Sequence, residues 1–127
     1  MSFQATLRTD AFSNALGISS VRNFTGDLQV SIGQSVAGLT TDQEILAGID
    51  ISELKLLVIS SDVALTIKTN NSGAPTDTLS IAAGVPYIWG ENDYNAKLLT
   101  GDVTKLFVTN ATAGVAALRI LALINLP

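Results

Sequence analysis

The chain contains no cysteine and no histidine among its 127 residues. Without cysteine it has no disulfide framework and no thiolate metal site. Histidine is the usual general base near neutral pH and the commonest metal ligand, so its absence removes the main residue of hydrolytic and zinc chemistry. No serine lies in a Gly-x-Ser-x-Gly elbow, and the scattered acids do not single out a catalytic pair. We therefore predict a protein that is not an enzyme and uses no cofactor.

Charged residues are also scarce, at 14% of the chain, and only seven residues are basic. Nucleic-acid binding requires a basic stripe, so no nucleic-acid partner is expected for a chain of net charge −4. The most apolar window, residues 114–127, contains Arg119 and is too short to cross a bilayer. Residues 1–12 lack the basic and apolar regions of a secretion signal. No membrane partner is expected either.

The mean hydropathy of +0.41 is high for a small domain with so few charges. One explanation is an aliphatic composition, because alanine and leucine raise the value. The other is that part of the exterior is covered by further subunits, since obligate interfaces are as apolar as a core. Both explanations remain open from composition alone.

Alternation of apolar and polar residues predicts β-strands through most of the chain. In residues 26–33 the apolar positions are Leu28, Val30 and Ile32, which is the period-2 pattern of a half-buried strand. Residues 53–60 are apolar nearly throughout, as in a more central strand. Turn clusters separate about eight such segments, and helical periodicity is almost absent. We predict one all-β domain over residues 21–127, a jelly-roll-like antiparallel β-sandwich, with an immunoglobulin-like sandwich as the second choice.

Two passages resemble each other and favour the jelly roll. Residues 50–54, "DISEL", and residues 102–106, "DVTKL", each open a predicted strand, and an Ala-Leu-x-Ile segment follows each of them. Chance similarity between short strands is the alternative. If the similarity is real, the passages occupy equivalent places in two halves of a double Greek key, and each Asp accepts hydrogen bonds from turn amides.

Residues 1–20 are predicted to form an N-terminal arm or a short helix. Thr9 or Asp10 is a suitable cap for a helix over residues 11–16, and Gly17 would end it. The apolar residues of the segment, Phe3, Leu7 and Phe12, are too few to form a core of their own. We expect an arm that docks on a partner or a neighbouring subunit, the alternative being an edge strand of the sandwich.

The C-terminal strand is apolar on both faces, which predicts a subunit interface. One face carries alternate residues from Ala116 to Ile124, and the opposite face carries Arg119, Leu121 and Leu123. A strand of an open sandwich normally turns polar side chains outward, so this second face requires a cover. A loop of the same chain or another subunit would provide it. We predict a homo-oligomer with Arg119, Leu121 and Leu123 near the subunit boundary.

The aromatic segment 86–94 is a candidate ligand surface. Tyr87, Trp89 and Tyr94 lie beside an acidic loop, and such a set can stack on a sugar ring and bind its hydroxyls. The same loop offers carboxylates and carbonyls for calcium, although it lacks an EF-hand pattern. The structural alternative is that Ile88 or Trp89 closes one end of the sandwich and that the acidic loop is a solvated turn.

Residues 62–120 resemble small virion proteins of tailed bacteriophages. The resemblance is carried by a strand ending in "IKTN", a proline-containing turn, the segment "TLSIAAGVPYIW", the strand "DVTKLFVTN" and the strand that follows it. It implies a capsid cement (decoration) protein with a β-sandwich fold, which sits on the capsid exterior as a trimer and binds the major capsid protein. The arm with Phe3, Leu7 and Phe12 would then dock on the capsid. The alternatives are a carbohydrate-binding or receptor-binding module and a tail or baseplate accessory protein.

Overall fold

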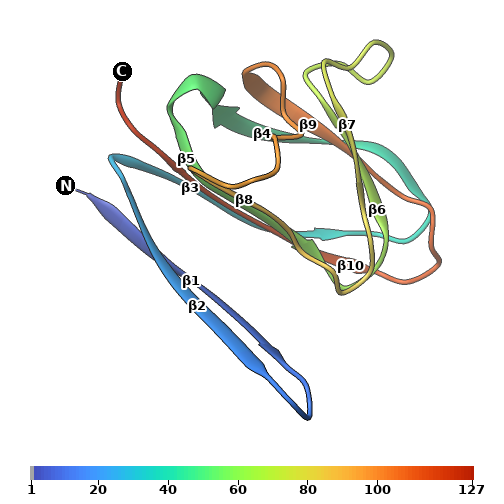
Figure 1. Ribbon diagram of the computed structural model, residues 1–127. Coiled ribbons are helices and arrows are strands. Elements are labelled where there is room, and N and C mark those ends of the chain that lie inside the picture. The colour runs from blue at the N-terminus through green and yellow to red at the C-terminus, as the bar shows by residue number, and fades with distance from the viewer. Residues whose placement is uncertain (1) are drawn as a thin grey trace.

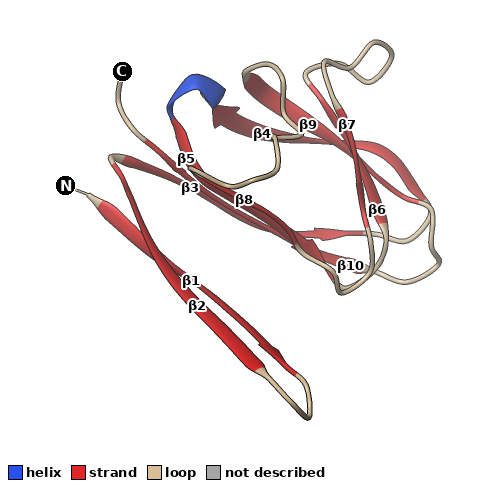
Figure 2. Ribbon diagram, in the orientation of Figure 1, coloured by secondary structure: helices blue, strands red, loops and turns tan. Residues whose placement is uncertain are grey.

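The computed structural model describes residues 2–127, so Met1 of the predicted arm lies outside it. Those residues form ten β-strands and one short 3₁₀ turn, η1 (Ile51–Glu53), with no α-helix (Figures 1 and 2). The strands are β1 (Phe3–Phe12), β2 (Gly17–Gly26), β3 (Leu28–Val36), β4 (Thr40–Ile49), β5 (Leu54–Ser61), β6 (Leu65–Thr69), β7 (Thr78–Ile81), β8 (Tyr87–Gly90), β9 (Val103–Asn110) and β10 (Ala116–Ile124).

Strands β3 to β10 form a jelly roll of two four-stranded antiparallel sheets. One sheet has the order β3-β10-β5-β8 and the other has the order β4-β9-β6-β7. Consecutive strands therefore alternate between the sheets except at the β6–β7 hairpin. The pairs β3–β10, β4–β9, β5–β8 and β6–β7 nest inside one another, as in a single long hairpin rolled into a sandwich. This order confirms the jelly roll and differs from the immunoglobulin arrangement.

The two similar passages of the sequence supply the central strands of both sheets. The segments β5–β6 and β9–β10 each contribute one central strand to each sheet, so their places are equivalent. Asp50 accepts a hydrogen bond from the backbone N–H of Ser52 at 3.0 Å, and Asp102 accepts one from that of Ile51 at 3.0 Å. Both aspartates satisfy turn amides, as the sequence predicted.

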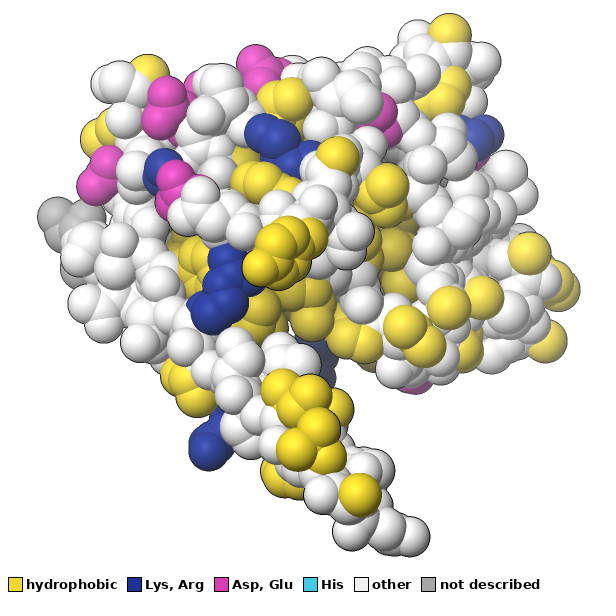
Figure 3. Space-filling model, in the orientation of Figure 1, with side chains coloured by type: hydrophobic (Ala, Val, Ile, Leu, Met, Phe, Trp, Pro, Cys, Tyr) yellow, Lys and Arg dark blue, Asp and Glu magenta, His cyan; other side chains and the backbone are white. Residues whose placement is uncertain are grey.

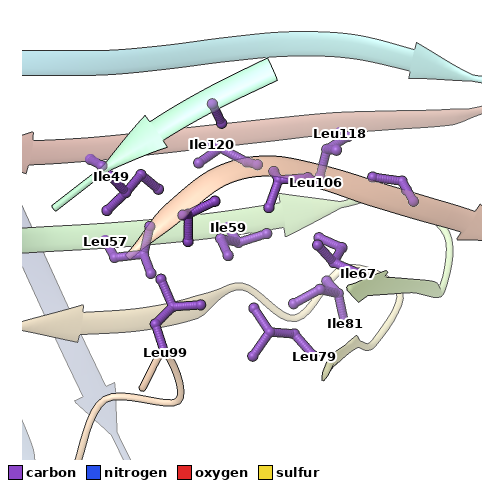
Figure 4. Close-up of a cluster of buried hydrophobic side chains, with 14 of the residues drawn as sticks. Ile49, Leu57, Ile59, Ile67, Leu79, Ile81, Leu99, Leu106, Leu118 and Ile120 are labelled. Atoms are coloured by element: carbon purple, nitrogen blue, oxygen red, sulfur yellow. The ribbon is translucent and has the colours of Figure 1, made fainter. Parts of the chain in front are cut away.

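The main core lies between the two sheets, where alternate side chains of each strand point inward (Figure 4). On β10 the inward residues Leu118, Ile120, Ala122 and Ile124 are all buried. The core residues labelled in Figure 4 come from both sheets and from the β8–β9 loop: Ile49, Leu57, Ile59, Ile67, Leu79, Ile81, Leu99, Leu106, Leu118 and Ile120.

Residues 3–26 form a β-hairpin, so the predicted short helix is wrong. Strands β1 and β2 pair along their whole length, from Phe3 opposite Gly26 to Phe12 opposite Gly17. The turn between them is closed by the N–H of Ser13, which donates to the carbonyl of Leu16 at 2.7 Å. A helix of six residues has too few hydrogen bonds to be stable alone, whereas the hairpin gains a full ladder and a packed face. The hairpin is a separate two-stranded sheet and not an edge strand of the sandwich.

The first half of the hairpin, which consists of residues 3–7 and the residues 22–26 paired with them, packs on the outer face of the β3-β10-β5-β8 sheet. Phe24, Leu56 and Leu123 are buried together there. Partly buried residues of both partners surround them: Phe3, Ala5, Leu7, Val58 and Leu121. The two-faced strand β10 is thus covered by its own chain. Leu123 is fully buried, which corrects its predicted place at a subunit boundary, and Phe3 and Leu7 attach the hairpin to the sheet and are not free docking residues.

Replacing Phe24 should separate the hairpin from the sheet, whereas replacing Phe12 should not. We expect Phe24→Ala to lower the free energy of unfolding by about 3 kcal/mol, because a buried ring is lost and a cavity remains. Phe12→Ala is the matched control. Its ring is 75% exposed, so the change should stay within about 1 kcal/mol. Urea unfolding of both variants measures the difference, and equal losses would show that the hairpin is not held through Phe24.

Candidate docking surfaces

The attachment of the hairpin is reinforced by Arg22 of β2. Its guanidinium donates to the carboxylate of Asp93 and to the carbonyl of Glu91, both in the β8–β9 loop. The same guanidinium lies 4.8 Å from the centre of the Phe24 ring. Gly90 leaves room for that ring, because a Cβ at this position would lie 2.5 Å from it. The hairpin is therefore fixed at one point by stacking, ion pairing and close contact.

A polar cavity of about 440 Å³ adjoins this attachment. Its lining includes the two cations Arg22 and Lys55. Each is already paired with an acid of the β8–β9 loop, Arg22 with Asp93 and Lys55 with Glu91 at 2.9 Å. With both charges neutralised, the cavity is explained as part of the attachment and not as an anion site.

The second half of the hairpin, residues 8–21 with the turn, projects from the two sheets and packs against neither of them (Figures 1 and 3). Every residue from Arg8 to Val21 is exposed. The exposed fractions of its large apolar residues are 75% for Phe12, 64% for Leu16, 61% for Ile18 and 55% for Val21. A two-stranded ribbon is marginal in water by itself, and exposed apolar side chains gathered on one element are typical of interaction sites. Of the three predicted arm residues, Phe12 alone is available for contact.

One end of the jelly roll forms a second apolar surface, which we call the apolar end. It consists of the loops 37–39, 62–64, 82–86 and 111–115, which join β3 to β4, β5 to β6, β7 to β8 and β9 to β10. Apart from Asp62 and Thr112, every residue of these loops is Ala, Gly, Val, Leu or Pro. Leu39, Val85 and Val115 are 76%, 60% and 62% exposed.

The opposite end of the jelly roll is acidic. The loops between β4 and β5, β6 and β7, and β8 and β9 carry Asp50, Glu53, Asp77, Glu91, Asp93 and Asp102. In Figure 3 apolar side chains gather at the lower right of the body and on the hairpin, and acidic ones lie mostly at the upper left. The molecule therefore has one charge-poor end and one charged end.

Internal hydrogen bonds hold the loops of the apolar end in place. The amide of the buried Asn110 donates to the carbonyls of Val36 at 3.1 Å and Gly114 at 2.8 Å, and its oxygen accepts from the N–H of Thr112 at 3.0 Å. Asp62 accepts from the N–H of Ala117 at 2.7 Å. Asn110, Thr112 and Asp62 therefore tie the loops together, so the apolar end is preorganised, and the exposed Asp62 is the one charged residue of these loops.

Leu39 of the apolar end has a strained backbone, with φ of 57°. The other non-glycine residues with positive φ are Asp42, Asn70 and Asn92, which are the short polar types that tolerate this region. The N–H of Leu39 donates to the carbonyl of Thr112 at 2.8 Å, so this backbone conformation joins two loops of the apolar end while the side chain stays exposed. Strained backbone of this kind is often found at functional sites.

The structure does not bring Tyr87, Trp89 and Tyr94 together as an open stacking platform. Tyr87 and Trp89 are half-buried and pack against the main core. The hydroxyl of Tyr87 accepts from the N–H of Leu98 at 3.0 Å, Trp89 Nε1 donates to the carbonyl of Asn95 at 3.1 Å, and Lys97 Nζ lies 5.2 Å from the indole centre. Tyr94 alone is fully exposed.

Residues 2–127 contain no group of three or more acidic side chains placed to hold a metal ion. The acids of the aromatic segment, Glu91 and Asp93, are paired with Lys55 and Arg22. Within the same residues there is no helix long and apolar enough to span a membrane. The calcium alternative for this loop therefore has no ligand set among these side chains.

Local sequence patterns do not reveal the apolar end, because each of its four loops has the composition of an ordinary turn and only the jelly-roll topology places them together. The one signal in the sequence is the composition of small apolar residues that the four loops share. The contact among Arg22, Phe24 and Gly90 is equally hidden, because these residues come from segments far apart in the chain.

The ion pair of Asp93 makes the hairpin attachment sensitive to acid. Burial of the Asp93 carboxylate raises its pKa. Hydrogen bonds from the Gly90 N–H and from Arg22, together with the charge of Arg22, lower the pKa by more, so the pKa of Asp93 lies below its ordinary value. A carboxyl with a lowered folded-state pKa stabilises the fold above its unfolded pKa of about 4, and this contribution is lost as the pH falls through the folded-state value. We expect the stability difference between the natural chain and Asp93→Asn to be greatest near neutral pH and to shrink below about pH 4. Urea unfolding from pH 7 to pH 2.5 measures it, and a difference that does not change with pH would rule out the ionised pair.

Comparisons with protein-family models, with curated protein sequences and with solved structures find no match to this chain. The resemblance of residues 62–120 to virion proteins therefore stays a prediction. The surfaces that the fold offers to a partner are the hairpin, the apolar end and the acidic end.

Proposed function

We propose that this chain is a structural protein of a tailed-bacteriophage virion, a cement protein that binds the major capsid protein on the capsid exterior through the apolar end. The observation that carries the proposal is the apolar end itself, a surface of small side chains that includes the exposed, strained Leu39. A rigid surface of this kind suits binding to a fixed lattice, because little conformational entropy is lost on contact.

Two further observations support this role. The jelly roll is a common fold of viral coat proteins, although it also occurs in lectins, so the fold alone does not choose between them. The predicted sugar-stacking residues Tyr87 and Trp89 make internal hydrogen bonds, which favours the structural role over carbohydrate binding. Binding through the apolar end would leave the acidic loops, which lie at the opposite end, facing away from the partner.

Replacing Leu39 by asparagine should weaken capsid binding without destabilising the fold. Asparagine tolerates positive φ better than leucine, so we expect the free energy of unfolding to stay level or to rise by about 0.5–1 kcal/mol. Loss of the exposed leucine should reduce binding about tenfold, the effect of removing one apolar contact residue worth about 1.4 kcal/mol. Cosedimentation with capsids assembled from the major capsid protein alone measures binding, and thermal unfolding measures stability.

Leu46→Asn is the matched control, because Leu46 is 78% exposed but lies within β4, away from the apolar end. It should leave capsid binding unchanged. Equal weakening by both variants, or unchanged binding with Leu39→Asn, would place the contact elsewhere. Running the same assay with purified tails separates the head role from a tail or baseplate role, in which the chain would bind tails and not capsids.

A further inference from the structure

The hairpin covers only half of the outer face of the β3-β10-β5-β8 sheet. Side chains on this face form rows across the strands, and the registers define each row. The first row includes Leu123, Leu56 and Gly90, which lie under Phe24. The next rows are Ser31, Leu121, Val58 and Ile88, and then Gly33, Arg119 and Ser60. Burial decreases along them, from fully buried Leu123 through half-buried Leu121 to exposed Arg119.

The uncovered rows form an open groove of about 490 Å³. Its floor includes Val58 and Leu121, which also border the hairpin, so the groove continues the existing hairpin–sheet contact. Gly33 leaves open space, because a Cβ there would meet no atom within 4 Å. Arg119 is the one charged residue of the groove, and within residues 2–127 it makes no ion pair. The groove is thus apolar, roomy and marked by one unpaired cation.

The projecting half of the hairpin carries features that complement this groove. On β1 the residues facing the sheet are Phe3, Ala5 and Leu7, so the alternate residues face away from it. Asp10 and Phe12 belong to this outward face, as does Val21, which pairs with Arg8. The carboxylate of Asp10 has a single cationic neighbour, Arg8 at 3.8 Å, and both side chains are solvent-accessible. The outward face therefore presents an aromatic ring, a valine and the exposed, weakly paired Asp10 and Arg8.

We propose that the projecting half of the hairpin docks into the groove of a second copy of this chain, with Phe12 on the apolar floor and Asp10 paired with Arg119. The hairpin cannot fill its own groove, because the outward face is turned away from its own sheet. One chain thus carries both surfaces of the contact: the projecting half of the hairpin with Phe12 and Asp10, and the apolar groove with Arg119. The contact joins two different surfaces of the same chain. Repeating it builds a ring where the rotation closes and an open helical filament where it does not, and a mutual exchange of hairpins gives a pair. This inference does not depend on the proposed capsid role.

A second copy fits these surfaces better than an unrelated partner, for two reasons. The groove extends an interface that the same hairpin already makes with the same sheet, so shape and chemistry continue across it. The two charges are also complementary. Arg119 makes no ion pair within residues 2–127, and Asp10 has only the exposed Arg8 as a cationic neighbour, at 3.8 Å. A charge pair at the rim of an apolar contact fixes its register.

Charge exchange at Asp10 and Arg119 tests the contact. The protein alone is studied by light scattering after size exclusion and by sedimentation velocity. We expect the natural chain to self-associate at micromolar concentration, and Asp10→Arg and Arg119→Asp each to weaken association at least tenfold. The double variant should restore most of it, because the pair is re-formed with opposite signs. Phe12→Glu should abolish association.

Lys105→Asp is the matched control, since Lys105 is a partly exposed cation of the other sheet, paired with Glu44 at 3.4 Å. It should leave association unchanged, and thermal unfolding should show that all variants are folded. A natural chain that is monomeric at 50 µM, about the upper limit for a functional micromolar contact, would overturn the proposal. An oligomer that survives both single charge changes, or a double variant no better than the single ones, would overturn it as well.

Discussion

Strands β5 and β10 are apolar on both faces, and the whole arrangement depends on covering both. Their inner faces form the core between the two sheets. Their outer faces would expose Leu56 and Leu123, and the hairpin formed by residues 3–26 covers them. Because the hairpin is fixed at Phe24, Gly90 and the Arg22–Asp93 pair, its first half is anchored and its second half projects. The projection of residues 8–21 is therefore a consequence of how the first half of the hairpin covers the outer face.

The fold also separates the chemistry of the two ends of the molecule. In a jelly roll the connections alternate between the ends, so four loops meet at one end and the others at the opposite end. Small apolar residues occupy most of the first set, and the second set carries six acids. Each set is rigid, because buried Asn110 holds one and the aspartates hold the other. Both ends of the jelly roll therefore present preorganised surfaces.

Sequence patterns predicted the jelly roll well and the N-terminal segment poorly, for a physical reason. Period-2 alternation and turn clusters depend on local chemistry, so β3, β6 and β10 could be recognised. The hairpin depends on a contact between Phe24 and a sheet formed much later in the chain, and its own alternation is weak in "TDAFSN". A local helix cap at Thr9 or Asp10 was a reasonable competitor until that distant packing decided the outcome.

By itself the sequence determined that the protein is all-β, that it has no histidine or cysteine chemistry, and that its last strand needs cover on both faces. Only the tertiary structure decided what provides the cover. The sequence allowed either another subunit or the same chain over Leu123, and the hairpin takes that place because a tethered segment covers the face without the entropy cost of association. The tertiary structure also brought Leu39, Val85 and Val115 to one end, since their closeness follows from strand order and not from local pattern.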